Sequence, residues 1–320
     1  MATAAEGKYA GEYLANSGAD LGFINDNVVV LSGQSLVPGD VVGKVTIAGI
    51  GRVSVPTVVG TGNGTCTLVT AGPLVQVGSY VATCTAAATH GGVFTVVAPD
   101  GTTVGTLTMT GGTGATTAFR SPHLNFSLTD GSSDFIVGDA FTFVVGTTAP
   151  TVLGGTGTGT ISALSVGKFA QVGNYKVINR EVVASGGRFE VIAPDGRTVG
   201  VFGMNTTSTG TYDFVSDHIN FTLTDATDFI AGNYFNVAVY GPAAAPKVAK
   251  WDPTATDGRQ HVAGIAFDTY DASAADVNGV ITARGPVAVN GNELSWISTA
   301  GAGDKVYGKQ RLTALGIVVR

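Results

Sequence analysis

The sequence predicts a mainly β protein, in which a discontinuous β-rich domain with one short C-terminal helix is interrupted by two tandem β-sandwich-like repeats. Three observations predict this. One block pattern occurs twice in the middle of the chain. The 47 glycines, many of them beside threonine and valine, are typical of short strands joined by turns. From Lys247 onward the composition changes, and both tryptophans lie beyond that point.

The duplicated region consists of three matched blocks at held spacing. The first copy contains Gly91–Gly105, His123–Asp130 and Asp134–Val145, and the second contains Gly186–Gly200, His218–Asp225 and Asp228–Val239. A unit of roughly 90 residues is too long for one solenoid repeat and suits a small domain. We therefore predict one β-repeat over residues 57–150 and a second over 151–242.

Comparison of the copies predicts which side chains face each core. Phe94, Val96 and Ala98 match Phe189, Val191 and Ala193, whereas Thr95 matches Glu190, so the Phe/Val face is the buried one. The same test places a second set of side chains inside, namely Phe126, Leu128, Phe141, Phe143 and Val145 with their counterparts. It places Ser127 and Thr222 outside, and it turns Cys66 toward the core because Cys66 matches Ile161.

Composition excludes several classes of function. Charged residues make up 12% of the chain and the net charge is −6, which argues against nucleic acid as the main partner. No apolar run approaches the ~20 residues that span a bilayer, and Met1–Gly11 lacks the features of a signal peptide. Cys66 and Cys84 have no cysteine counterparts in the second copy. This favours reduced thiols and cytosolic synthesis, with a local disulfide as the alternative.

The flanks predict a domain built from residues 21–56 and 243–320, preceded by an arm over residues 1–20. Strands are predicted over Asn27–Leu31, Asp40–Ala48, Val262–Phe267, Val280–Ala283, Gly285–Val289 and Ile317–Val319. A helix is predicted over Asp304–Leu315, with Asp304 as its cap, an apolar side of Val306, Leu312 and Leu315, and Gly316 ending it. The first 20 residues are either a disordered terminus or an arm that orders on a partner, with tyrosines as anchors.

Motifs that suggest chemistry have simpler interpretations. The runs Gly60–Gly64 and Gly154–Gly159 lack the Lys-Ser/Thr of a phosphate loop, so we interpret them as connectors. His123 and His218 occupy equivalent positions in the two copies, but no second His or Cys is shared nearby at metal-ligand spacing. This favours a structural or surface role for the histidines. The Asp130–Asp134 and Asp225–Asp228 turns offer oxygen ligands for Ca²⁺ but are also ordinary turn sequences. We predict no enzyme activity, no catalytic residue, no cofactor and no metal.

The tail resembles the lambda-type head decoration protein family of tailed bacteriophages. The resemblance rests on KWDPTATDGRQHVAGIAF at Lys250–Phe267, ITARGPVAV at Ile281–Val289, ELSW at Glu293–Trp296 and KQRLTALGIVV at Lys309–Val319. GKYAGEYLANSG at Gly7–Gly18 and NVVVLSGQSLVPGDVVGKVT at Asn27–Thr46 are similar to longer members. These segments cover under half of the chain, and the repeats lie outside the minimal family pattern.

The resemblance implies a structural virion protein on the outer surface of the phage head. It implies a homotrimer at three-fold sites, made in the host cytoplasm, with an N-terminal arm that adds a strand to the major capsid protein. The arm residues so implied are Lys8, Tyr9, Glu12, Tyr13 and Leu14. Trp251, Asp252 and Trp296 are implied in the core or trimer interface of the decoration domain.

Two alternatives stay open at this point. The repeats could bind host-surface glycans through loop aromatics, for which Phe119, Tyr212 and Phe214 are the candidates. A tail-tube or fibre protein is the other alternative, and it predicts open or sixfold assembly.

Overall fold

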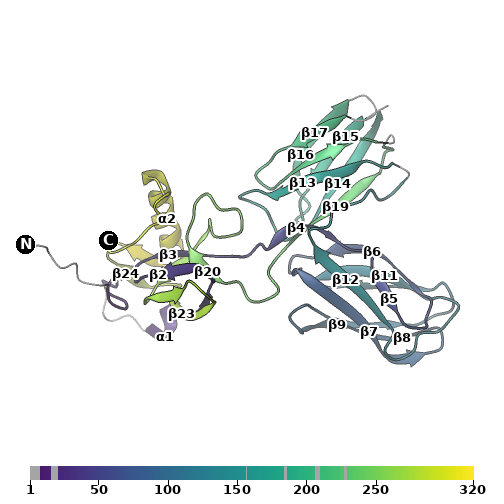
Figure 1. The fold of residues 1–320 in the computed structure, drawn as a ribbon, viewed down its shortest axis with the longest axis horizontal. Helices are drawn as coiled ribbons and strands as arrows, with labels where there is room; N and C mark the ends of the chain where they lie inside the picture. Colours follow the sequence, from purple (N-terminus) through teal and green to yellow (C-terminus); the bar gives the residue numbers. More distant parts are fainter. Residues whose placement is uncertain (1–7, 16–20, 156, 184–185, 206–209, 227–228) are drawn as a thin grey trace, which may run out of the picture. The chain divides into compact units, whose positions relative to one another are not determined.

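The structure is a computed structural model that describes all residues except 1–7, 16–20, 156, 184–185, 206–209 and 227–228 (Figure 1). It is 50% strand and 5% helix, which confirms the mainly β class. The chain forms two compact units. One joins Met1–Thr46 to Ala245–Arg320, and the other is Ile47–Ala244. The sequence prediction drew the domain boundaries at 56/57 and 242/243, where this division has 46/47 and 244/245, and the predicted domain assignment stays a prediction.

The discontinuous unit is built around a closed five-stranded barrel (Figure 1). The barrel order is β1 (Asn25–Val30), β20 (Val248–Lys250), β3 (Val41–Lys44), β21 (Val262–Ala266) and β23 (Val277–Thr282). Short pairs complete the unit: β2 (Gln34–Leu36) with β22 (Tyr270–Ala272), and β24 (Val287–Val289) in parallel with β25 (Ile317–Val319). One turn of helix, α1 (Leu21–Ile24), precedes β1. Closing the barrel pairs the backbone of the core strands without leaving an open edge.

The C-terminal helix α2 (Ala302–Ala314) begins two residues before the predicted start. Gly301 is its N-cap, and the main-chain N–H of Gly301 donates to Oδ2 of Asp304 at 2.9 Å, so Asp304 is the third helical residue and not the cap. Leu312 is buried and Leu315 half-buried as predicted, but Val306 is 58% exposed, so its assignment to the buried face was wrong. Gly316 follows the C-cap with φ +81°, a conformation that favours glycine.

The second unit contains both repeats. The first repeat comprises β5 (Thr57–Val59), β6 (Thr65–Ala71), β7 (Gly78–Ala88), β8 (Gly91–Val97), β9 (Thr103–Met109), β10 (Thr116–Arg120), β11 (Leu124–Thr129) and β12 (Ala140–Gly146). The second comprises β13 (Thr160–Val166), β14 (Gly173–Val183), β15 (Gly186–Ile192), β16 (Thr198–Asn205), β17 (Thr211–Phe214), β18 (Ile219–Thr224) and β19 (Tyr234–Tyr240). Each repeat packs a long sheet against a three-stranded one, β10-β11-β6 or β13-β18-β17.

Strand β4 (Gly49–Val53) joins the long sheets of the two repeats. It pairs antiparallel with β12 through Val53 and Arg52, and with β19 through Gly49, Ile50 and Gly51. The result is one continuous path of strands, β16-β15-β14-β19-β4-β12-β7-β8-β9. The sequence prediction assigned this segment to the discontinuous domain, as part of residues 21–56. The assignment of residues 57–150 and 151–242 to separate domains stays a prediction.

The predicted inward faces of the repeats are confirmed. Two equivalent clusters form the cores, centred on Phe94, Phe126 and Phe143 in the first repeat, and on Phe189, Phe221 and Phe235 in the second. Ser127 is the exception. It was predicted to face water but is only 4% exposed, because it lies in the central strand β11, between Ala118 of β10 and Thr67 of β6. A small side chain in that position is covered by both neighbours.

We expect Gly51→Ala to destabilise the second unit. A Cβ atom at position 51 would lie 2.0 Å from the carbonyl oxygen of Gly146, so the backbone of β4 or β12 has to move. Overpacking of this kind costs about 1–3 kcal/mol. Gly146→Ala is the matched control, since a Cβ there meets nothing within 4 Å. Thermal unfolding of both variants tests the junction, and equal transition temperatures would contradict it.

Candidate functional site

The N-terminal segment Lys8–Ala15 lies against the barrel unit through main-chain hydrogen bonds. The N–H of Gly11 donates to the carbonyl of Phe267 at 2.8 Å, and the N–H of Ala15 donates to the carbonyl of Ala288 at 2.9 Å. Leu14 forms an isolated antiparallel bridge with Val289, the last residue of β24. The segment therefore already pairs with its own unit along residues 11–15.

Tyr13 fastens this segment. Its side chain is fully buried, and its hydroxyl lies 2.6 Å from the Thr282 hydroxyl. Thr282 donates its proton to Oδ1 of Asn25 at 2.9 Å, so the Tyr13 hydroxyl must be the donor to Thr282. Burial raises the pKa of Tyr13 far above its ordinary value. The prediction that Tyr13 anchors the arm to a partner was wrong in this respect, since its ring is in the core of its own unit.

The residues before Tyr13 face outward. Tyr9 is 64% exposed, and Lys8 and Glu12 are exposed too. Lys8 Nζ donates to the carbonyl of Glu293 at 2.7 Å, and the N–H of Tyr9 donates to the Glu12 carboxylate at 2.7 Å. Of the five arm residues named from sequence, Lys8, Tyr9 and Glu12 are exposed to solvent. Leu14, like Tyr13, packs against the barrel unit.

The two tryptophans meet beneath helix α2. Trp251 is fully buried, donates from Nε1 to the carbonyl of Gln260 at 2.9 Å, and lies edge-to-face with Trp296 at 5.5 Å. Gly308 of α2 brings the helix close, since a Cβ there would lie 2.4 Å from the Trp296 ring. Asp252 accepts from the N–H and hydroxyl of Thr254 and shapes the turn after Trp251. Trp251 belongs to the buried cluster of the unit and Trp296 packs against it, whereas Asp252 is half-buried in the turn. A role of these residues in a trimer interface stays a prediction.

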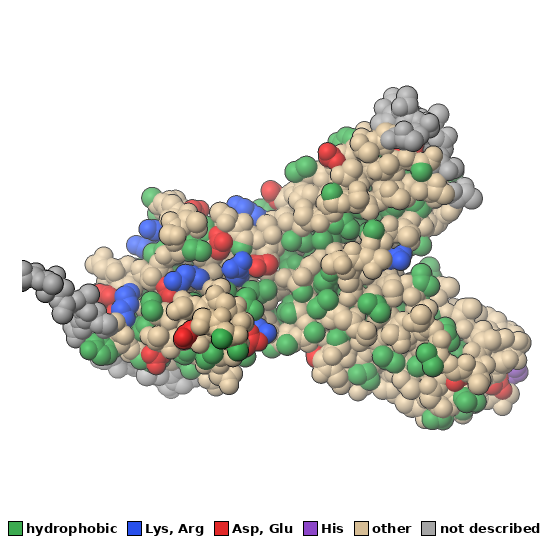
Figure 2. Space-filling model, viewed as in Figure 1, with side chains coloured by type: hydrophobic (Ala, Val, Ile, Leu, Met, Phe, Trp, Pro, Cys, Tyr) green, Lys and Arg blue, Asp and Glu red, His purple; other side chains and the backbone are tan. Residues whose placement is uncertain are grey.

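Sequence reasoning missed several exposed apolar side chains of the barrel unit. Phe23 precedes β1, Val306 and Tyr307 lie on α2, and Val318 lies on β25. Lysine, arginine and acidic side chains also gather over this unit, whereas the visible surface of the repeats carries few of them (Figure 2). Strand β25 is too short, and helix α2 too weakly amphipathic, for the sequence pattern to predict which of their side chains are exposed. The fold is needed to identify these exposed apolar residues.

The glycan-binding candidates lie inside the repeats. Phe119 and Phe214 are 4% and 7% exposed and stack on Phe126 and Phe221 across the strand pairs. Tyr212 is half-buried and stacks on Phe202 with ring centroids 4.5 Å apart. The expectation that these aromatics are exposed in loops was wrong, because they belong to β10 and β17 and complete the cores.

The matched histidines have a matched structural partner. The Tyr80 hydroxyl lies 3.0 Å from Nδ1 of His123, and the Tyr175 hydroxyl lies 3.1 Å from Nδ1 of His218. Each tyrosine also accepts from the N–H of a glutamine, Gln76 or Gln171, which leaves its own proton for the histidine. Burial lowers the pKa of His123 and raises that of Tyr80 to about 12, so both groups are neutral at pH 7. This arrangement ties a turn to the sheet in both repeats.

The other motifs also have structural roles in the described residues. The glycine run Gly60–Gly64 binds the carboxylate of Asp139, to which the N–H of Gly62 donates at 2.9 Å. Both cysteines are free thiols, as favoured from sequence, and burial raises the pKa of Cys66 to about 12. No helix in the described residues is long and apolar enough to cross a membrane.

Comparison with known proteins identifies the family. The sequence profile of the bacteriophage lambda head decoration protein D matches residues 3–317, nearly the whole chain. The chain belongs to this head decoration protein family. The family is one of structural virion proteins, so the resemblance seen in the flanks extends to the chain as a whole.

Curated proteins and solved structures give no further evidence on the function of this decoration family member. No curated protein matches the sequence. The flagellar hook junction protein FlgK from Burkholderia pseudomallei matches with 16% identity over 66% of this chain, at a TM-score of 0.20. The match spans 45% of the length of that solved structure. A likeness at this level carries no argument about function.

Proposed function

We propose that this chain is a capsid decoration protein that binds the outer surface of a phage head and stabilises the shell. In this proposal it acts as a homotrimer at three-fold sites, with the major capsid protein as its partner. It does so without catalysis, cofactor or metal-dependent chemistry. Membership of the head decoration family supports the proposal. The proposal assigns the binding role to the barrel unit and its N-terminal segment.

The observation that carries the proposal is that the segment Lys8–Ala15 is anchored at its C-terminal end and exposed at its N-terminal end. Its C-terminal part is held by Tyr13 and Leu14, while Lys8, Tyr9 and Glu12 before it are exposed. A segment anchored at one end keeps the residues before it close to their target, which lowers the entropy lost on binding. Addition of a strand to an exposed sheet edge is a common way for such segments to bind.

The repeats enter the proposal as accessory domains on the virion. On the face that Figure 2 shows they carry few charged side chains, and the aromatics that favoured glycan binding pack into their cores. Since Arg120 is the only lysine or arginine between residues 57 and 150, electrostatic attraction to an anionic partner is weak there.

The test is binding to expanded heads that lack this protein. Deletion of residues 1–7, and separately Tyr9→Ala, is expected to weaken binding while the barrel unit stays folded, because the Tyr13 anchor is kept. In a trimer each arm contributes to avidity, so the deletion should lower apparent affinity by about 10²-fold or more. Co-sedimentation with heads, alongside circular dichroism, measures both properties.

Ser273→Ala is a suitable control because Ser273 is an exposed loop residue of the same unit. Unchanged sedimentation of the 1–7 deletion with heads would refute the arm. Failure of the intact protein to bind heads of any kind would refute the proposed function itself.

A further inference from the structure

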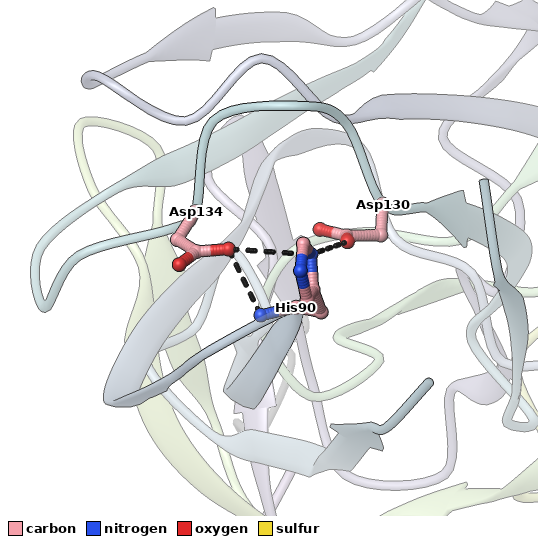
Figure 3. A group of neighbouring side chains, drawn as sticks. All are labelled: His90, Asp130 and Asp134. Atoms are coloured by element: carbon pink, nitrogen blue, oxygen red, sulfur yellow. Dashed lines mark hydrogen bonds and ion pairs between the residues drawn. The ribbon is translucent and has the colours of Figure 1, made fainter. Parts of the chain in front are cut away.

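Three loops converge at one end of the first repeat, around His90 (Figure 3). His90 lies in the turn between β7 and β8, Asp130 and Asp134 lie between β11 and β12, and Thr113 lies between β9 and β10. Figure 3 shows the two carboxylates on opposite sides of the His90 ring, both pointing toward it. His90, Asp130 and Asp134 each offer one ligand atom, and these three atoms all lie within 4.8 Å of one another.

The distances in this cluster match the spacing of ligands around an ion. Nδ1 of His90 lies 3.3 Å from Oδ2 of Asp130 and 3.6 Å from Oδ1 of Asp134. Oγ1 of Thr113 lies 3.4 Å from the same nitrogen. These separations exceed the ~2.9 Å typical of N–H···O hydrogen bonds. Around a tetrahedral Zn²⁺ with bonds of about 2.0–2.2 Å, neighbouring ligand atoms lie about 3.3–3.6 Å apart.

Asp130 supplies an independent reason to expect a cation. Its side chain is 0% exposed, and neither carboxylate oxygen accepts a hydrogen bond from any residue that the structure describes. A buried carboxylate without hydrogen bonds is costly unless a positive charge compensates it. Arg120 is the sole lysine or arginine of residues 57–150, and its guanidinium donates to the main-chain carbonyls of Phe119 and Phe126. In the described part of the chain, His90 is the one basic side chain within ion-pair distance of Asp130.

The loops are held in place by contacts that leave the ligand atoms facing one another. The N–H of Ser133 donates to the Asn63 side chain at 2.8 Å, and the Asn63 amide donates to the Ser132 hydroxyl at 2.9 Å. The N–H of His90 donates to Asp134 at 2.9 Å, which ties the β7–β8 turn to the same loop. His90 and Asp134 are 43% and 44% exposed at their side chains, so the group is open to solvent on one side.

We infer that His90, Asp130 and Asp134 form a binding site for a divalent transition-metal ion of the Zn²⁺ type. One imidazole nitrogen and two carboxylate oxygens are ligands that Zn²⁺ accepts, and the exposed side leaves a fourth position for the Thr113 hydroxyl or water. Ca²⁺ and Mg²⁺ are poorer occupants, because they prefer six or more oxygen ligands. The bound ion neutralises Asp130 and cross-links the β7–β8 and β11–β12 loops at this end of the repeat, together with the β9–β10 loop where Thr113 is the fourth ligand.

The second repeat provides an internal comparison. Asp225 corresponds to Asp130, but Ser185 stands in the sequence where the first repeat has His90. The imidazole ligand is thus particular to the first repeat. The inference therefore predicts one such ion per chain, and it is independent of the capsid-binding proposal.

The test is a titration of the intact, metal-free protein with Zn²⁺ by calorimetry. The variants are His90→Asn, Asp130→Asn and Asp134→Asn. Asparagine tolerates the φ of +56° at position 90, so His90→Asn preserves the turn. Asp225→Asn is the matched control for changing a buried aspartate. We expect one Zn²⁺ to bind the wild type and Asp225→Asn, and each ligand variant to lose more than about tenfold in affinity.

Thermal unfolding gives a second readout that does not depend on calorimetry. Zn²⁺ should raise the transition temperature of the wild type and leave that of His90→Asn unchanged. Absence of Zn²⁺ binding would overturn the inference, and so would equal affinity in His90→Asn and wild type. Tighter binding of Ca²⁺ or Mg²⁺ than of Zn²⁺ would overturn the assignment of the ion class.

Discussion

Trp251→Ala is expected to unfold the barrel unit well below the temperature at which the wild-type unit unfolds. The side chain is fully buried, contacts Trp296 and donates to Gln260, so alanine leaves a large cavity and an unpaired carbonyl. Removal of a buried tryptophan or phenylalanine side chain costs about 3–5 kcal/mol. For a unit of this size the transition should fall by on the order of 10 °C or more.

Calorimetry separates this effect from the repeats, because the second unit has its own cores and should keep its transition. Val306→Ala is the control on the same unit, since Val306 is exposed on α2 and should change little. A Trp251→Ala protein with an unshifted barrel transition would show that the tryptophan pair contributes little to the core.

Tyr13→Ala is expected to release the N-terminal segment. The variant loses a fully buried ring and leaves the Thr282 hydroxyl without its donor, at a cost of about 3–5 kcal/mol by analogy with other buried aromatics. Hydrogen exchange at the N–H groups of Ala15 and Asn290, which bond across this contact, should accelerate strongly. Head binding should weaken as well, because the residues before Tyr13 lose their fixed starting point.

Tyr13→Phe distinguishes packing from hydrogen bonding. It keeps the ring and removes only the donor to Thr282, so the expected loss is about 1–3 kcal/mol and the segment should stay bound. If Tyr13→Ala retained full protection at Ala15 and Asn290, the anchoring role of the tyrosine would be refuted.

The buried faces of the repeat strands were predicted well from the sequence, because the duplication gives two aligned sequences for each strand. Phe94 against Phe189, and Thr95 against Glu190, settle the buried side from a period of two. The same comparison could have placed Phe119 and Phe214. Each lies seven residues before a core phenylalanine and is its cross-strand partner. They were taken as exposed because the surrounding residues differ between the copies.

Other features depend on contacts that sequence spacing does not encode. Tyr13 contacts Thr282, which is 269 residues away in the sequence, and no local sequence pattern predicts this contact. His90 and Asp130 come from different loops, 40 residues apart in the chain, so they show none of the short spacings by which metal sites are recognised in a sequence. The family match supports the general role, but such long-range pairs need the fold.

Strand β4 has a consequence for how the repeats are made and used. It is synthesised before either repeat, yet its partners β12 and β19 come about 90 and 185 residues later in the chain. Its ladder with β12 can form only once β12 is made, and its ladder with β19 only once β19 is made. A fragment that starts at residue 57 lacks β4, so Val145 and Gly146 of β12 and the facing edge of β19 lose their strand partner and become prone to aggregation. Fragments for binding or display work should therefore start at Ile47.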